Sequence, residues 1–217
     1  MLILTKRLIR LIIIPLLSGA TVAVWAEDGR VHELSFFSGA LQREMPVSVI
    51  APREPTGEST VLVLLHGRGR NHRSLLDASP SRERLLAADM WVILSQGEDG
   101  WYINSPVKLQ DRYEDYLDEV IAFAKAEFGL AQPPAQWAIT GWSMGGYGAV
   151  RYATRHPGKF GSVSAMIGLL DFPRDATLPA GQNYVVPLDR FGRGSGEWAL
   201  LNPFNAVARL RGKPILL

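Results

Sequence analysis

Gly141-Trp142-Ser143-Met144-Gly145-Gly146 is the stretch that decides the fold of this chain. It follows an apolar run, Trp137 to Thr140, and precedes a segment from Met144 to Arg155 that ends at His156-Pro157-Gly158. This order predicts a buried strand, a sharp turn and a helix. The glycines let the turn tighten without Cβ clashes, so Ser143 Oγ is expected at the sheet edge beside the free N–H groups of the helix N-terminus. Ser143 is therefore a candidate nucleophile. A chance G-x-S-x-G is the alternative, and the strand before it and the helix after it disfavour that alternative.

The rest of the chain alternates between apolar runs and helical patterns. Runs without polar interruption, such as 60–65, are typical of strands that a parallel sheet buries on both faces. The alternation predicts an α/β fold with a mostly parallel, doubly wound sheet and helices on both faces. No internal repeat or linker is visible, so residues 27–217 are expected to form one domain. The predicted strands cover 31–37, 45–50, 60–65, 91–94, 137–140, 160–167 and 214–217, and the predicted helices cover 79–88, 112–128, 144–155 and 203–210.

Residues 1–26 have the pattern of an export signal. A basic start and an apolar stretch over 11–24 precede Val24-Trp25-Ala26, which supplies the small residues of a cleavage site. An uncleaved membrane anchor is the alternative, and Pro15 and Gly19 disfavour it because they interrupt a stretch already short for a span. The protein is expected to be exported and to become periplasmic or extracellular after cleavage. It would contact a membrane only through an uncleaved signal.

Charge and cysteine content exclude several classes of function. The chain has 23 Lys and Arg against 21 Asp and Glu, and the excess of positive charge comes from the basic start. Because no polybasic tract remains, a nucleic-acid partner is not expected. The chain has no cysteine, which excludes disulfides and thiolate metal sites. The oligomeric state cannot be read from the sequence.

A nucleophilic serine needs a general base and a group that orients it. His156 is the one histidine after Ser143, and along one helix it would lie roughly 20 Å away, far beyond hydrogen-bond reach. His66 is expected to be a packed, hydrogen-bonded residue. Asp171 is a candidate acid because it follows a predicted strand, although a cap on the turn before Phe172-Pro173 is the favoured interpretation.

Main-chain N–H groups are candidates for stabilising a developing oxyanion. Met144 would supply one N–H from the helix start, and the loop after the strand 60–65 would supply a second from Gly67 or Arg68. Aromatic side chains are candidates for the wall of an acyl or alcohol pocket, with ordinary core packing as an equal alternative. These pocket candidates are Trp101, Tyr102 and Trp142.

Segments in a characteristic order run through nearly all of residues 27–217. They are Leu64-Leu65-His66-Gly67, Asp99-Gly100-Trp101-Tyr102-Ile103-Asn104-Ser105-Pro106, Tyr113-Glu114-Asp115-Tyr116, Ile139-Thr140-Gly141-Trp142-Ser143-Met144-Gly145-Gly146-Tyr147-Gly148-Ala149, His156-Pro157, Gly168-Leu169-Leu170-Asp171, Asn202-Pro203-Phe204 and Lys213-Pro214-Ile215-Leu216-Leu217. In this order they resemble the esterase D-like branch of the α/β-hydrolases. That branch includes S-formylglutathione hydrolases, tributyrin-type esterases, secreted feruloyl and acetyl esterases, and mycolyltransferases.

The resemblance implies an α/β-hydrolase fold with Ser143 as nucleophile, and with Gly67, Arg68 and Met144 at the oxyanion hole. It implies a small acyl ester or thioester as substrate and no metal or organic cofactor. One departure is the loop Arg68-Gly69-Arg70-Asn71, in which a glycine is shifted relative to the usual pattern.

The family's acid and histidine follow the strand that 214–217 would begin. The 217 residues are therefore expected to be a C-terminally incomplete α/β-hydrolase domain that lacks the last strand or strands and a helix. Such a chain is expected to turn over little substrate. Two alternatives stay open: a non-catalytic pseudo-hydrolase that binds a ligand, and an acyltransferase of the same fold.

Overall fold

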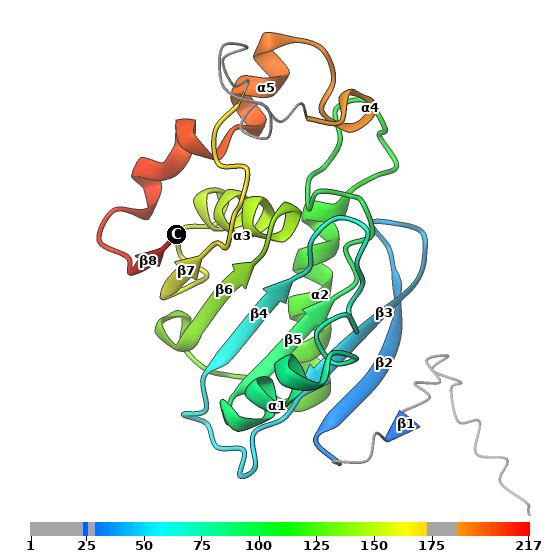
Figure 1. Cartoon of the computed structure of the whole chain (residues 1–217), viewed down its shortest axis with the longest axis vertical. Coiled ribbons are helices and arrows are strands. Elements are labelled where there is room, and N and C mark those ends of the chain that lie inside the picture. The colour runs from blue at the N-terminus through cyan, green and yellow to red at the C-terminus, as the bar shows by residue number, and fades with distance from the viewer. Residues whose placement is uncertain (1–23, 26–28, 173–185) are drawn as a thin grey trace, which may run out of the picture.

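The computed structural model describes residues 24–25, 29–172 and 186–217. They build an eight-stranded sheet with the order β1-β2-β3-β5-β4-β6-β7-β8 (Figure 1). The strands are β1 (Val24–Trp25), β2 (Val31–Ser38), β3 (Arg43–Ile50), β4 (Val61–Leu65), β5 (Trp91–Ser95), β6 (Trp137–Gly141), β7 (Ser162–Ser164) and β8 (Ile215–Leu216).

The sheet is mixed but mostly parallel, which confirms the predicted fold class. Strands β1 to β3 form an antiparallel meander, and β3 joins β5 in antiparallel register with Val49 opposite Ile93. From β5 onward the pairs β5–β4, β4–β6, β6–β7 and β7–β8 are all parallel. Every residue of β5 is buried, as expected for a continuous apolar run in the middle of a parallel sheet.

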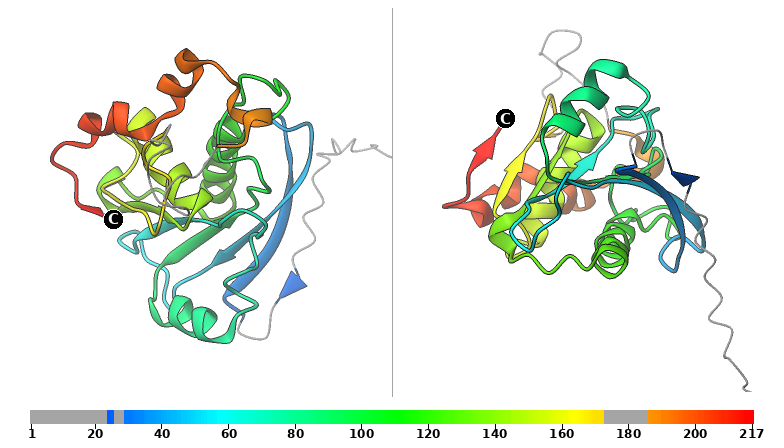
Figure 2. Two further views of the ribbon diagram at one scale, coloured as in Figure 1. Left: turned by 45° about the horizontal axis from the view of Figure 1, so that its top comes forward. Right: turned by 90° about the horizontal axis from the view of Figure 1, so that it is seen from below.

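Helices cover both faces of the sheet (Figure 2). Helices α2 and α3 lie on one face, where their apolar sides and the sheet form the larger hydrophobic core. Helix α1 lies on the other face over a smaller cluster that includes Leu64, Val92 and Leu94. The helices are α1 (Ser79–Ala87), α2 (Tyr113–Phe128), α3 (Met144–Arg155), α4 (Leu188–Phe191) and α5 (Ser195–Leu201), with 3-10 helices η1 (Pro134–Gln136) and η2 (Pro203–Leu210).

Three local expectations needed correction. The predicted helix over 203–210 is a 3-10 helix, and the short helices α4 and α5 were not predicted. The strand predicted over 160–167 is regular only from Ser162 to Ser164. Its ladder gives way to an isolated bridge between Trp142 and Met166, and Ile167 then turns the chain away with φ 48°.

Two predictions about the chain ends extend beyond what the structure describes. Most of the predicted export signal lies outside the described residues, and the backbone of Val24–Trp25 pairs with β2. None of the described helices is long and apolar enough to cross a membrane. At the other end, β8 pairs with β7 and leaves Leu216 and Leu217 exposed at the sheet edge.

Candidate active site

Ser143 lies at the sharp turn between β6 and α3. Its backbone has φ 53° and ψ −118°, a conformation that costs a non-glycine residue energy, and its side chain is exposed. Hydrogen bonds hold the turn in this shape. The Ser143 N–H donates to Met166 O at 2.8 Å, and the Gly145 N–H donates to Trp142 O at 2.8 Å. The chain therefore keeps one strained residue in place, and that residue carries the exposed hydroxyl.

Glycine at position 145 lets two backbone segments touch behind this serine. A Cβ there would lie 2.1 Å from Leu65 O and 2.7 Å from His66 O, both backbone atoms. Gly141 is equally confined, because its Cβ would meet Gly145 C at 2.4 Å. The end of β4 is thus pressed directly against the start of α3.

The loop after β4 packs on the same turn. A Cβ at Gly67 would lie 2.8 Å from Trp142 Nε1 and 3.3 Å from Trp142 O, so this loop touches the residue before Ser143. The loop closes as a turn in which the Arg70 N–H donates to Gly67 O at 3.2 Å. Gly69 adopts φ 70°, so the shifted glycine occupies the one loop position that needs a left-handed backbone.

Asp99 also shapes this loop, a role that was not anticipated. Its carboxylate accepts a hydrogen bond from the Gly69 N–H at 2.8 Å. A signal was present in the sequence, because Asp99 follows β5, and β4 and β5 are parallel neighbours whose carboxyl ends meet at one edge.

His66 is a structural residue of the loop. Its Nδ1 lies 2.8 Å from Gly67 O, and its Nε2 accepts a hydrogen bond from the Gly97 N–H at 2.8 Å. A carbonyl can only accept, so Nδ1 carries the proton and the imidazole is neutral. Burial lowers the pKa of His66 below its ordinary value of 6.5. Both ring nitrogens are occupied, which leaves neither free to deprotonate a nucleophile.

This neutral histidine predicts a loss of stability in mild acid. Because its folded-state pKa is depressed, the unfolded chain binds more protons as the pH falls through 6.5. The free energy of unfolding should therefore be highest above that pH and fall as the pH is lowered through and below it. Urea unfolding of wild type and His66→Gln across this range should show a shallower pH dependence in the variant. Equal slopes would contradict the assignment.

The remaining histidines have partners away from Ser143. His32 packs its ring on Phe128, and His72 Nε2 lies 3.8 Å from Glu33. His156 follows the last residue of α3, whose first turn adjoins Ser143, and its Nε2 lies 3.6 Å from Glu114. The described residues include all four histidines of the chain, and the structure pairs none of them with Ser143.

The other candidate site residues differ in position. Asp171 is exposed and accepts a hydrogen bond from Asn202 Nδ2 at 2.7 Å, which links it to the start of η2. Trp101 and Tyr102 are buried in the larger core, and the Tyr102 hydroxyl donates to His66 O at 3.2 Å. Trp142 is half-buried beside the loop. Only Trp142 of the three aromatic candidates thus lies partly open next to the serine.

No set of three or more His, Cys, Asp and Glu side chains among the described residues is arranged to hold a metal ion.

A mostly parallel sheet with an exposed serine at a strand-turn-helix junction places this chain among the α/β-hydrolases. The chain belongs to the Putative esterase family, whose model matches residues 38–206. It is 25% identical over 159 residues to an acetyl esterase of Caldicellulosiruptor saccharolyticus, and the match covers 69% of this chain and 60% of that enzyme.

Solved structures share the fold. The substrate-bound fluorophosphonate-binding serine hydrolase F of Staphylococcus aureus superposes with a TM-score of 0.69 at 20% identity, covering 86% of this chain and 76% of that one. An S-formylglutathione hydrolase of the same organism has a TM-score of 0.61 at 19% identity, covering 90% of this chain and 75% of that one. These likenesses show the fold, and the family match shows that the chain belongs to the Putative esterase family.

Proposed function

We propose that this protein is a serine carboxylesterase-type acyl hydrolase that acts on small acyl esters or thioesters. The observation that carries the proposal is the strained, exposed Ser143 at the N-terminus of α3. Its Oγ attacks the acyl carbonyl carbon, loses its proton to a base, and expels the alcohol or thiol to leave an acyl-serine. Water then cleaves the acyl-serine to release the carboxylic acid and regenerate the hydroxyl.

The backbone around Ser143 offers N–H groups that could bind the oxyanion formed when the acyl-serine is made and again when water cleaves it. The Met144 N–H belongs to the first turn of α3, where main-chain N–H groups have no partner within the helix. The packing of Gly67 on Trp142 brings a second segment with N–H groups, those of Gly67 and Arg68, to the same turn. We propose that these donors stabilise the developing negative charge.

The described residues do not supply the base. His66 uses both ring nitrogens in the loop, and His156 lies at the opposite end of α3. General base catalysis contributes about 10²–10⁴-fold, so the 217 residues alone should turn over little substrate. The chain spans 60% of the length of the acetyl esterase that it matches. The esterase activity of the whole protein is therefore a proposal.

The engaged histidines also favour a second candidate, a pseudo-hydrolase that binds a ligand without turning it over. Added imidazole separates the two candidates, because it can replace a missing base only where the nucleophile and oxyanion donors are in place. Acyl transfer to another alcohol shares the acyl-serine, and analysis of the products distinguishes it from hydrolysis.

The test is the rate at which a fluorophosphonate probe labels the chain, followed by intact mass with and without imidazole. We expect slow labelling that imidazole accelerates by at least about tenfold. Ser143→Ala should abolish the labelling. Ser162→Ala, which replaces a serine in β7, should leave the labelling rate unchanged. Labelling that persists in Ser143→Ala would contradict the assigned nucleophile. If Ser143 stays unlabelled at every imidazole concentration, the result would favour the pseudo-hydrolase that binds a ligand without turning it over.

We also propose that the protein is exported, with residues 1–26 as a cleaved signal. The basic start, the apolar stretch and the small residues before Glu27 support this proposal. N-terminal sequencing of the protein recovered from cells tests it. A mature chain that begins at Met1 would contradict it.

A further inference from the structure

A pocket lies between α3 and the α5–η2 segment, and Ser143 is not among its lining residues. Its volume is about 170 Å³, room for roughly five or six water molecules. Arginine side chains from both walls line it, Arg151 and Arg155 from α3 and Arg209 from η2. Thr154, Asn202 and Asn205 add polar groups, and none of the described residues that line the pocket is acidic.

Arg151 is the most unusual member of the pocket. It is 5% exposed, and its Nη1 donates to Glu114 at 2.7 Å. Its Nε is also buried but has no hydrogen-bond acceptor among the described residues. A buried donor without an acceptor costs free energy, and a bound acceptor would remove that cost. Arg151 thus lines the pocket and also carries a buried N–H without an acceptor.

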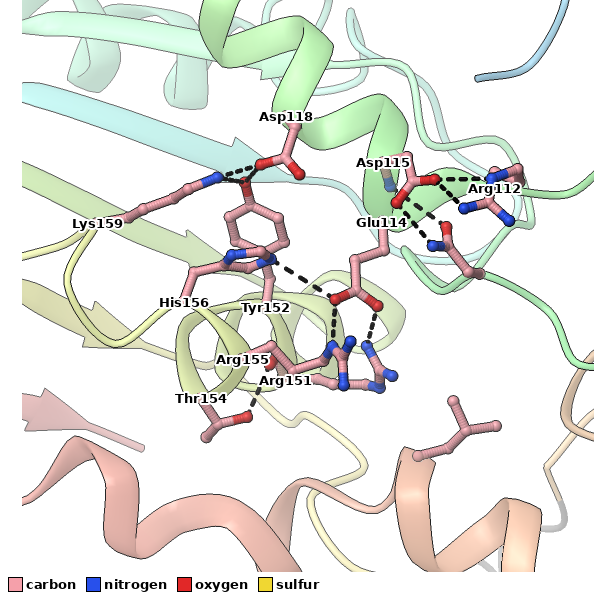
Figure 3. Close-up of polar contacts among 12 residues, drawn as sticks. Arg112, Glu114, Asp115, Asp118, Arg151, Tyr152, Thr154, Arg155, His156 and Lys159 are labelled. Atoms are coloured by element: carbon pink, nitrogen blue, oxygen red, sulfur yellow. Dashed lines mark hydrogen bonds and ion pairs between the residues drawn. The ribbon is translucent and has the colours of Figure 1, made fainter.

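The charges around the pocket leave it positive. Figure 3 shows Glu114 of α2 reaching both Arg151 and Arg155, with the two guanidinium groups side by side. Asp171 accepts a hydrogen bond from the lining residue Asn202 at 2.7 Å. Arg209 is exposed and has no acidic partner in the part of the chain that the structure describes. The lining arginines therefore retain N–H groups that Glu114 does not use.

Guanidinium groups on two walls of one pocket suit an ion with oxygens in several directions. A carboxylate presents two oxygens in one plane, whereas a phosphate group presents at least three and can accept from all three arginines. We propose that this pocket binds a phosphate group, either inorganic phosphate or a phosphate monoester, at a site distinct from Ser143. Arg151 lies eight residues beyond Ser143, about 12 Å along α3.

Binding of inorganic phosphate to the 217-residue chain, measured by calorimetry at constant ionic strength, tests the proposal. We expect saturable binding with one phosphate per chain. Arg209→Gln should weaken it by at least about tenfold, because it removes a charged donor from one wall. Arg211→Gln is the matched control, since Arg211 is exposed just beyond η2 and does not line the pocket. Thermal unfolding of both variants establishes that each is folded.

Further binding measurements identify the ligand and distinguish this pocket from the candidate esterase site at Ser143. Glycerol phosphate that binds more tightly than inorganic phosphate would assign the pocket to monoesters, and the reverse order would assign it to the free ion. Ser143→Ala should bind phosphate like wild type. The proposal is overturned by absence of saturable phosphate binding, or by equal weakening in Arg209→Gln and Arg211→Gln. Acetate binding as tightly as phosphate would also overturn it.

Discussion

Gly145→Ala is expected to cost about 3 kcal/mol or more of folding free energy, a large share of what a domain of this size has. The added Cβ would lie 2.1 Å from Leu65 O and 2.6 Å from Leu65 C. These are backbone atoms of β4 in the middle of the sheet, so no side-chain rotation relieves the clash. Either β4 or the start of α3 must move.

The same movement would disturb the candidate site. Leu65 O accepts the Trp142 N–H at 3.3 Å, and the Gly145 N–H donates to Trp142 O, so a shift at position 145 disturbs both backbone hydrogen bonds of the residue before Ser143. We therefore expect the variant to lose imidazole-dependent labelling along with stability.

Urea unfolding followed by tryptophan fluorescence measures the effect of Gly145→Ala. Gly196→Ala is the control, because Gly196 lies inside α5 and a Cβ there would meet nothing within 4 Å. It should leave the stability unchanged or raise it by up to about 1 kcal/mol. A Gly145→Ala variant with an unfolding free energy within about 0.5 kcal/mol of wild type would contradict the close approach seen at this turn.

The sequence predicted elements well where local signals and packing agree. Helix α3 has the predicted bounds, Met144 to Arg155, because a tight glycine turn precedes it and Pro157-Gly158 follows it. The central strands β4 and β5 are apolar runs that burial on both faces explains, whereas β6 is buried on one face and half-buried on the other. Helix α5 has seven residues among several glycines, and its start is held by the Glu197 carboxylate accepting the Gly194 N–H. So short a helix has no periodicity to detect.

The sequence predicted the parts of the candidate site that local motifs define, but it did not predict residue clusters that only long-range packing brings together. The turn at Ser143 and the loop at Gly67 carry motifs of their own, and the contact between them follows from β4 and β6 being neighbours. The arginine pocket has no motif. Arg151 and Arg209 are far apart in the sequence, and only the packing of η2 on α3 brings them together.

Glu114→Leu is expected to destabilise the protein by about 3–5 kcal/mol. The Glu114 carboxylate is buried between α2 and α3 and accepts hydrogen bonds from Arg151 and Arg155 (Figure 3). Arg151 is equally buried, so loss of Glu114 leaves a guanidinium without a counter-charge in the interior. Arg155 is half exposed and can turn to solvent, which makes Arg151 the residue that determines the cost.

A double-mutant cycle tests that reasoning more sharply than one variant can. Glu114→Leu combined with Arg151→Met should recover most of the lost stability, because two apolar side chains can replace a buried ion pair at little or no cost. Asp189→Asn, which breaks the exposed pair with Lys108, should change the stability by less than about 1 kcal/mol. Additive losses in the double variant would mean that Glu114 acts through packing or through Arg155. Recovery would show that the buried pair matters because each charge needs the other, and that α2 holds the helix behind Ser143 through this contact.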